Sequence, residues 1–130
     1  MSLLRFHHCA IICSNYRKSK HFYTKVLGFR VLQETYRKER KSYKLDLQLE
    51  NNESSRIELF SFPDPPARLT RPEACGLRHL AFAVNSVRKT VQELNMKGVV
   101  CEPVRIDELT GKPFTFFRDP DDLPLELYEC

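Results

Sequence analysis

The stretch His8-Cys-Ala-Ile-Ile-Cys-Ser-Asn15 recurs further along the chain as His79-Leu-Ala-Phe-Ala-Val-Asn85. Both stretches run His-x-Ala-apolar, as a strand would, and both end at an Asn that we expect to open a helix. The predicted helices cover 16–27 and 86–97, and each stops at a glycine, Gly28 or Gly98. This pattern predicts that the chain contains two copies of one structural unit.

Three strand-like segments follow each predicted helix, at 29–35, 43–49 and 56–62 and again at 99–106, 113–118 and 123–129. The two units also close alike, since Ile57-Glu-Leu-Phe60 corresponds to Leu125-Glu-Leu-Tyr128. This pattern predicts two βαβββ modules, 4–62 and 77–130, joined by a proline-rich linker over 63–76 that can continue neither a helix nor a central strand. We expect one α+β domain over 1–130, a curved mixed sheet with helices on its outer side.

The composition excludes several classes of protein. The 130 residues carry a net charge of +4, and no run approaches the roughly 20 apolar residues of a membrane span. Five cysteines, an odd number without a Cys-x-x-Cys pair, and the lack of a signal-like N-terminus predict reduced thiols and a cytoplasmic protein. Five of the basic residues lie in 36–44, which we interpret as a charged hairpin tip rather than a nucleic-acid site.

Two histidines and two glutamates carry the candidate chemistry. Strand alternation places His8 and His79 opposite the bulky apolar residues that a helix should cover, and it places His7 on the other face from His8. Glu58 and Glu126 lie inside apolar strands, where a carboxylate is costly unless it is paired, protonated or bound to a metal. One such histidine is more often a hydrogen-bonded core residue, but the pair occurs twice at matching points. We expect the four side chains to bind one divalent first-row ion and to leave positions for water or substrate oxygens.

At these residues the sequence resembles the glyoxalase/bleomycin-resistance group, the vicinal oxygen chelate superfamily, and more closely its small bacterial glyoxalase I-like members. The resemblance covers essentially the whole chain, and the stretches that carry it are Ile57-Glu-Leu-Phe-Ser-Phe-Pro63, Arg71-Pro-Glu-Ala-Cys-Gly-Leu-Arg-His-Leu-Ala-Phe82 and Phe114-Thr-Phe-Phe-Arg-Asp-Pro-Asp121 through Leu125-Glu-Leu-Tyr128. It implies that His8, Glu58, His79 and Glu126 fall on the four metal-ligand positions of bacterial glyoxalase I. The implied metal is nickel, zinc or cobalt, with manganese or iron as further options.

The resemblance also implies a reaction, that of a lyase or isomerase in which the metal chelates neighbouring oxygens of a small substrate and stabilises an enediolate. Glu126 matches the glutamate proposed as the base, and Glu58 is its symmetric partner. A homodimer is implied, and the two His/Glu pairs could meet within one chain or across a two-fold axis. Two positions that help hold glutathione in bacterial glyoxalase I are Ile12 and Phe62 here, so a glutathione hemithioacetal is either held differently or is not the substrate. The candidates for anion contacts in their place are Arg37, Lys38, Arg40, Lys41, Arg78 and Arg118.

Two other functions remain open on the sequence. Two histidines and one glutamate resemble the facial triad of a non-haem iron dioxygenase, although Glu58 would occupy one of the open positions. The chain could also be a ligand-binding or resistance protein that does not turn its ligand over, as bleomycin-binding relatives are. The intact set of four ligands favours the lyase.

Overall fold

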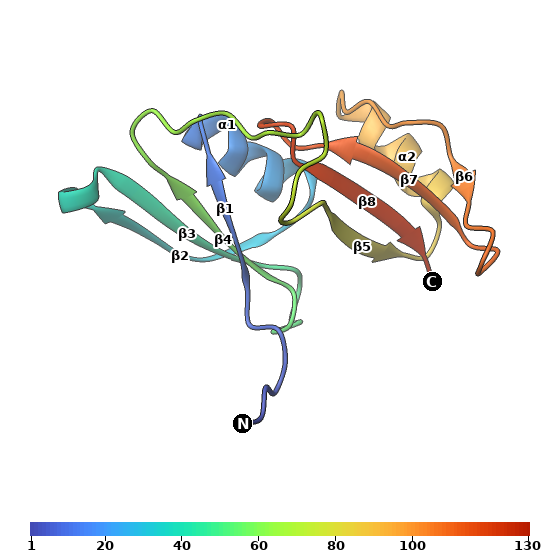
Figure 1. Cartoon of the computed structure of the whole chain (residues 1–130), viewed down its shortest axis with the longest axis horizontal. Coiled ribbons are helices and arrows are strands. Elements are labelled where there is room, and N and C mark those ends of the chain that lie inside the picture. The colour runs from blue at the N-terminus through green and yellow to red at the C-terminus, as the bar shows by residue number, and fades with distance from the viewer. The chain divides into compact units, whose positions relative to one another are not determined.

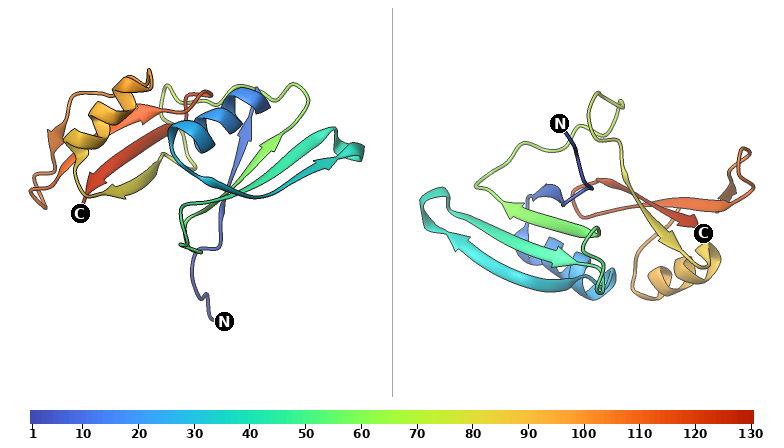
Figure 2. Two further views of the ribbon diagram at one scale, coloured as in Figure 1. Left: turned by 180° about the vertical axis from the view of Figure 1, so that it is seen from behind. Right: turned by 90° about the horizontal axis from the view of Figure 1, so that it is seen from below.

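A computed structural model describes residues 1–130 and divides them into two compact units, Met1–Ala67 and Arg68–Cys130. Each unit contains one four-stranded mixed sheet with a helical segment along one face, as Figures 1 and 2 show. No helix or strand is formed between Ser61 and Leu80, so the predicted linker over 63–76 is irregular chain. The boundary between the units lies within it.

In the first unit the sheet order is β1-β4-β3-β2, with β1 parallel to β4 and the other pairs antiparallel. A helical segment connects β1 to β2, and a short 3-10 turn connects β2 to β3. The elements are β1 (Cys9–Cys13), α1 (Tyr16–His21), a π-helix (Phe22–Val26), β2 (Arg30–Arg37), a 3-10 helix (Lys38–Arg40), β3 (Ser42–Gln48) and β4 (Arg56–Ser61).

The second unit repeats this topology, because its order is β5-β8-β7-β6 and β5 is parallel to β8. The elements are β5 (Leu80–Val84), α2 (Val87–Met96), β6 (Arg105–Ile106), β7 (Pro113–Arg118) and β8 (Pro124–Glu129). The same strand order in both units confirms the predicted repeat and the α+β fold. None of the helices has the length and apolar character needed to cross a bilayer.

The core of each unit lies between its sheet and its helix. Alternate strand residues are buried on that side, as the period of two in a strand requires. In the first unit these residues include Ile11, Cys13, Leu45, Leu47, Ile57 and Leu59, and in the second Phe117, Leu125 and Leu127. The remaining strand positions, among them the predicted glutamate ligands, therefore lie on the face that the helix leaves uncovered.

The two helices begin differently from one another. The side chain of Asn15 accepts a hydrogen bond from the backbone N–H of Lys18, which confirms the predicted cap of α1. In the second unit the prediction was wrong by one residue, because the hydroxyl of Ser86, rather than Asn85, accepts from the backbone N–H of Lys89. The first helix also changes form, since 22–26 continue as a π-helix that buries Phe22 and Tyr23.

The strand predicted over 99–106 is reduced to Arg105–Ile106. The N–H of Val99 still bonds to the carbonyl of Leu94, so that residue closes the helix instead of opening a strand. Pro103 has no N–H to give to a sheet, which explains why regular pairing begins only after it. The charged segment 36–44 forms the predicted hairpin tip between β2 and β3.

Candidate functional site

The first His/Glu pair lies at the start of β1 and in the middle of β4. His8 immediately precedes β1, and Ala10, two residues on, pairs with Glu58 across the parallel ladder. This register places Glu58 on the face away from α1, and His8 lies against it there, with Nδ1 3.3 Å from Glu58 Oε2. The Glu58 side chain is 16% exposed, so its carboxylate is largely removed from water.

Two further charged or polar groups surround this pair. Lys44 Nζ on β3 is 3.8 Å from Glu58 Oε1 and 3.3 Å from Asp46 Oδ1, so it shares its charge between two carboxylates. His7 was predicted to lie on the opposite face, and this was wrong: its Nδ1 is 2.9 Å from Nδ1 of His8. Strand alternation does not apply there, because β1 begins only at Cys9.

The second pair occupies the matching positions of the second unit. His79 immediately precedes β5, and Ala81 pairs with Glu126 on β8. His79 Nε2 is 3.5 Å from Glu126 Oε1, and the Glu126 side chain is 14% exposed. The ring of Phe116 meets the His79 ring edge-on, with centroids 5.1 Å apart. Glu126 has no other polar contact, so its largely buried carboxylate has a single distant partner.

The donor chemistry of these pairs fits a divalent metal ion. Imidazole nitrogens and carboxylate oxygens are the ligands that suit zinc, nickel and cobalt. Buried polar groups are normally hydrogen-bonded, so a buried carboxylate whose partner is an imidazole 3.5 Å away has capacity for another ligand. The structure brings His8 to Glu58 within the first unit and His79 to Glu126 within the second, two candidate ligands in each, and gathers no group of three or more such side chains.

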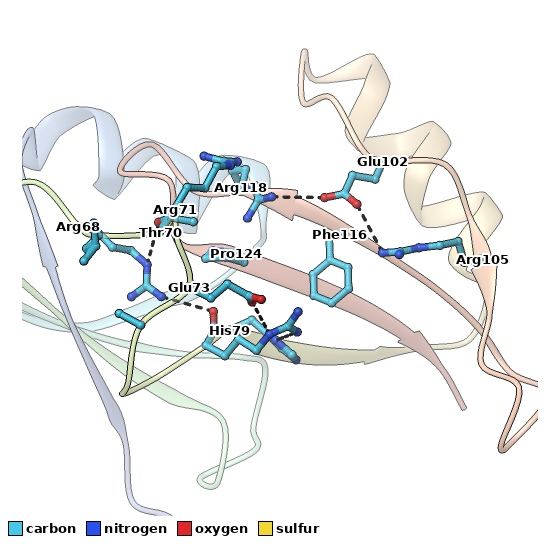
Figure 3. Close-up of a pocket in the computed structure, with 13 residues that line it drawn as sticks. Arg68, Thr70, Arg71, Glu73, His79, Glu102, Arg105, Phe116, Arg118 and Pro124 are labelled. Carbon is cyan, nitrogen blue, oxygen red and sulfur yellow. Dashed lines mark hydrogen bonds and ion pairs between the residues drawn. The ribbon is translucent and has the colours of Figure 1, made fainter.

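His79 also lines a pocket of about 320 Å³ in the second unit, which the sequence did not predict (Figure 3). Phe116 and Pro124 give the pocket an apolar part. Its charged lining comprises Arg68, Arg71, Glu73, Arg78, Glu102, Arg105 and Arg118. These residues come from three separate segments of the chain, so no spacing in the sequence brings them together.

The segment 68–78 forms one wall of this pocket, and hydrogen bonds from its side chains hold it in place. Arg68 donates to the backbone carbonyls of Leu77 and Arg78. The Thr70 hydroxyl donates to the carbonyl of Asp122, and Arg71 donates to the carboxylate of the same residue. The wall is therefore fixed to the turn between β7 and β8.

The predicted anion-contact residues divide between the two units. Arg78 and Arg118 line the pocket, and Arg78 Nη1 is 3.3 Å from His79 Nδ1. In the first unit the guanidinium groups of Arg37 and Arg40 lie over the ring of Phe62, at 5.7 and 6.0 Å from its centroid. Lys38 and Lys41 are exposed at the hairpin tip, and Ile12 is exposed on β1.

Tyr128 lies on the same face of β8 as Glu126 and is held by the loop between β6 and β7. Its hydroxyl donates to Asp107 Oδ2 at 2.9 Å and also hydrogen-bonds to Thr110. The backbone N–H of Leu109 and the Tyr128 hydroxyl stabilise the ionised form of Asp107, so the pKa of Asp107 lies below its usual value. The loop between β6 and β7 thus holds the Tyr128 ring on the face of β8 that carries Glu126.

The protein is built from two βαβββ modules. Each module has a four-stranded sheet, a helical segment on one face and one His/Glu pair. Residues 5–127 match the model of the glyoxalase/bleomycin resistance protein/dioxygenase superfamily, and the chain belongs to that superfamily. Members of the superfamily typically bind a divalent metal and a small molecule, and they commonly form dimers.

Relatives and solved structures agree with this membership. The chain is 69% identical over 129 residues to the protein YwkD of Bacillus subtilis (strain 168), with 99% of each chain covered. The structure of a glyoxalase family protein from Enterococcus faecalis is 50% identical, with a TM-score of 0.88 and coverage of 96% of this chain and 97% of that one. A trypanothione-dependent glyoxalase I of Leishmania major is 27% identical, with a TM-score of 0.73 and coverage of 98% and 87%.

Proposed function

We propose that this chain is a metal-dependent lyase or isomerase of glyoxalase type that acts on a small oxygenated molecule. One observation carries the proposal: each unit sets a histidine against a largely buried glutamate, and the two glutamates occupy the same register position of equivalent strand pairs. Two matching pairs are hard to explain by packing, because each sets a largely buried carboxylate between two apolar neighbours of its strand. Membership of the superfamily supports the same conclusion.

The four side chains His8, Glu58, His79 and Glu126 would hold one divalent ion, nickel, zinc or cobalt, either within a chain or across a homodimer. When bound, the ion would polarise neighbouring oxygens of the substrate and stabilise the negative charge that develops on them. The apolar ring of Phe116 against His79 limits the rotation of that imidazole and excludes water from one side of it.

Glu126 is our choice for the residue that moves the proton. Its only protein contact is His79, so once its bond to the ion loosens on substrate binding, turning toward a substrate carbon would break one weak contact. Glu58 contacts both His8 and Lys44, and the same movement there would separate it from an ammonium group. Glu126 would therefore take a proton from the carbon beside the polarised oxygens and return it to the neighbouring carbon, with Glu58 acting on the other face.

The test combines metal analysis with an activity panel. The purified full-length protein is analysed for bound metal, then stripped, reloaded with nickel, zinc, cobalt or iron, and assayed with thiol hemithioacetals and 2-oxo acids. The similarity to a trypanothione-dependent glyoxalase I supports including the thiol adducts. Turnover with nickel, cobalt or zinc is the expected result. Oxygen-dependent turnover with iron alone would favour a dioxygenase, and failure to bind any metal would favour a binding protein.

A further inference from the structure

The pocket beside His79 carries an excess of positive charge. Five arginines and two glutamates line it, a surplus of three positive charges without counting His79. Three of the arginines already have structural partners. Arg68 holds backbone carbonyls, Arg71 pairs with Asp122, and Arg78 donates to Glu73 at 2.5 Å. The remaining two, Arg105 and Arg118, have much weaker partners.

Arg105 and Arg118 share one carboxylate. Nη2 of Arg105 is 3.4 Å from one oxygen of Glu102, and Nη2 of Arg118 is 3.4 Å from the other. Contacts of this length between partly exposed groups are weak, and one negative charge does not neutralise two guanidinium groups. Arg118 has one further ion pair, with Asp122 at 3.8 Å. Both arginines therefore keep free N–H donors (Figure 3).

Arg105, on the edge strand β6, also stacks over two aromatic rings. Its guanidinium carbon lies 5.0 Å from the centroid of Phe114 and 5.7 Å from that of Phe116. Stacking of this kind limits the positions that Arg105 can adopt, so less freedom is lost when it binds an anion. Phe116 is the ring that contacts His79, and therefore one aromatic side chain touches both the arginine and the candidate metal ligand.

We propose that this pocket binds an anionic oxygen group of the substrate, a carboxylate or a phosphoryl group, between Arg105 and Arg118. Guanidinium groups suit such anions because their N–H donors match paired oxygens. Glu102 acts as an internal anion that the ligand displaces. The assignment of the reacting end of the substrate to His79 rests on the proposed function, and a pocket of about 320 Å³ limits the ligand to a small molecule.

The experiment measures anion binding by the metal-free full chain, so that it does not depend on metal chemistry. Inorganic phosphate and acetate are titrated separately at fixed pH and fixed ionic strength, and the Arg Nε–Hε signals are followed by NMR. Saturable shifts of Arg105 and Arg118 are expected. The R118Q and R105Q variants should each bind at least about 10-fold more weakly, because each removes charge-assisted hydrogen bonds to the anion.

Two further variants make the result specific. E102Q removes the internal competitor and should tighten anion binding severalfold, in the opposite direction from the arginine variants. Arg88→Gln, on the exposed side of α2, is the matched charge control and should leave binding unchanged. Saturation by phosphate alone or by acetate alone would identify which anion the pocket accepts.

The proposal would be overturned if neither phosphate nor acetate binding saturated. It would also be overturned if R118Q and Arg88→Gln lost anion affinity equally. A metal titration of the same samples separates the two proposals. Anion binding without metal binding leaves this subsite standing and removes the lyase, whereas metal binding without anion binding removes only the subsite.

Discussion

The two units share a His/Glu pair and differ in what surrounds it. In the first unit Lys44 lies 3.8 Å from Glu58 and His7 lies against His8. In the second, Glu126 has no cation beside it, and His79 instead faces an arginine-lined pocket. The strand register that builds the pair is the same in both units.

This difference indicates that the two glutamates, which occupy equivalent positions in the repeat, have different roles. A carboxylate held by an ammonium group suits a fixed ligand, whereas one with a single distant contact can move. The pocket next to the movable carboxylate is also where the arginines leave donors for a substrate. We therefore propose that both pairs bind the metal and that Glu126 transfers the proton.

The largest expected effect is on catalysis. Glu126→Gln should lower kcat by about 10²–10⁴-fold, because it removes the group that accepts the proton, while metal stays bound. Glu58→Gln should lower kcat less, since that carboxylate is retained mainly as a ligand. Steady-state kinetics with parallel metal analysis would check both. Unchanged turnover in metal-loaded Glu126→Gln would remove this residue from the role.

The next effect concerns the two cores. Leu59 and Leu127 are equivalent buried residues of β4 and β8, and Leu→Ala at either position should cost about 2–5 kcal/mol of unfolding free energy. If the two modules form one domain, both variants should show a single unfolding transition at lower denaturant concentration. Two separated transitions, with only one shifted in each variant, would show that the modules unfold independently.

A smaller effect is expected at the helix caps. Asn15→Ala and Ser86→Ala each remove one side-chain acceptor at a helix N-terminus and should each cost about 1 kcal/mol in chemical denaturation. Asn85→Ala provides the control, because Ser86 and not Asn85 caps α2. A loss in Asn85→Ala equal to that in Ser86→Ala would contradict the observed cap.

Much of the fold could be predicted from the sequence because the sequence contains an internal repeat. Alternation in 9–13 and 80–84 assigned the buried and open faces correctly, and the repeat predicted that both units contain the same succession of elements. Alternation failed where regular structure was absent, at His7 before β1 and over 99–104 before β6. The π-helix at 22–26 could not be told from an α-helix in the sequence, because its apolar residues have ordinary helical spacing.

The candidate site was predictable in its two His/Glu pairs and in two of the arginines that line the pocket, Arg78 and Arg118. His8 with Glu58 and His79 with Glu126 stand out because a charged residue recurs inside an apolar strand. Arg118 was among the predicted anion-contact residues, but Arg105 was not, since only the folded sheet places the two around one carboxylate. Pockets of this kind depend on contacts between distant segments, which periodicity does not encode.

The central claim is that both pairs bind a single ion, and metal stoichiometry tests it most directly. Metal-free protein is titrated with Co²⁺ and followed by its visible absorbance and by calorimetry, with His8→Ala, His79→Ala and the exposed-histidine control His21→Ala in parallel. We predict one ion per chain, unchanged in His21→Ala, and an affinity lower by at least about 100-fold in each of the other variants, since even outer-shell partners account for 10–100-fold. Two ions per chain, or unchanged affinity after loss of either pair, would contradict the account.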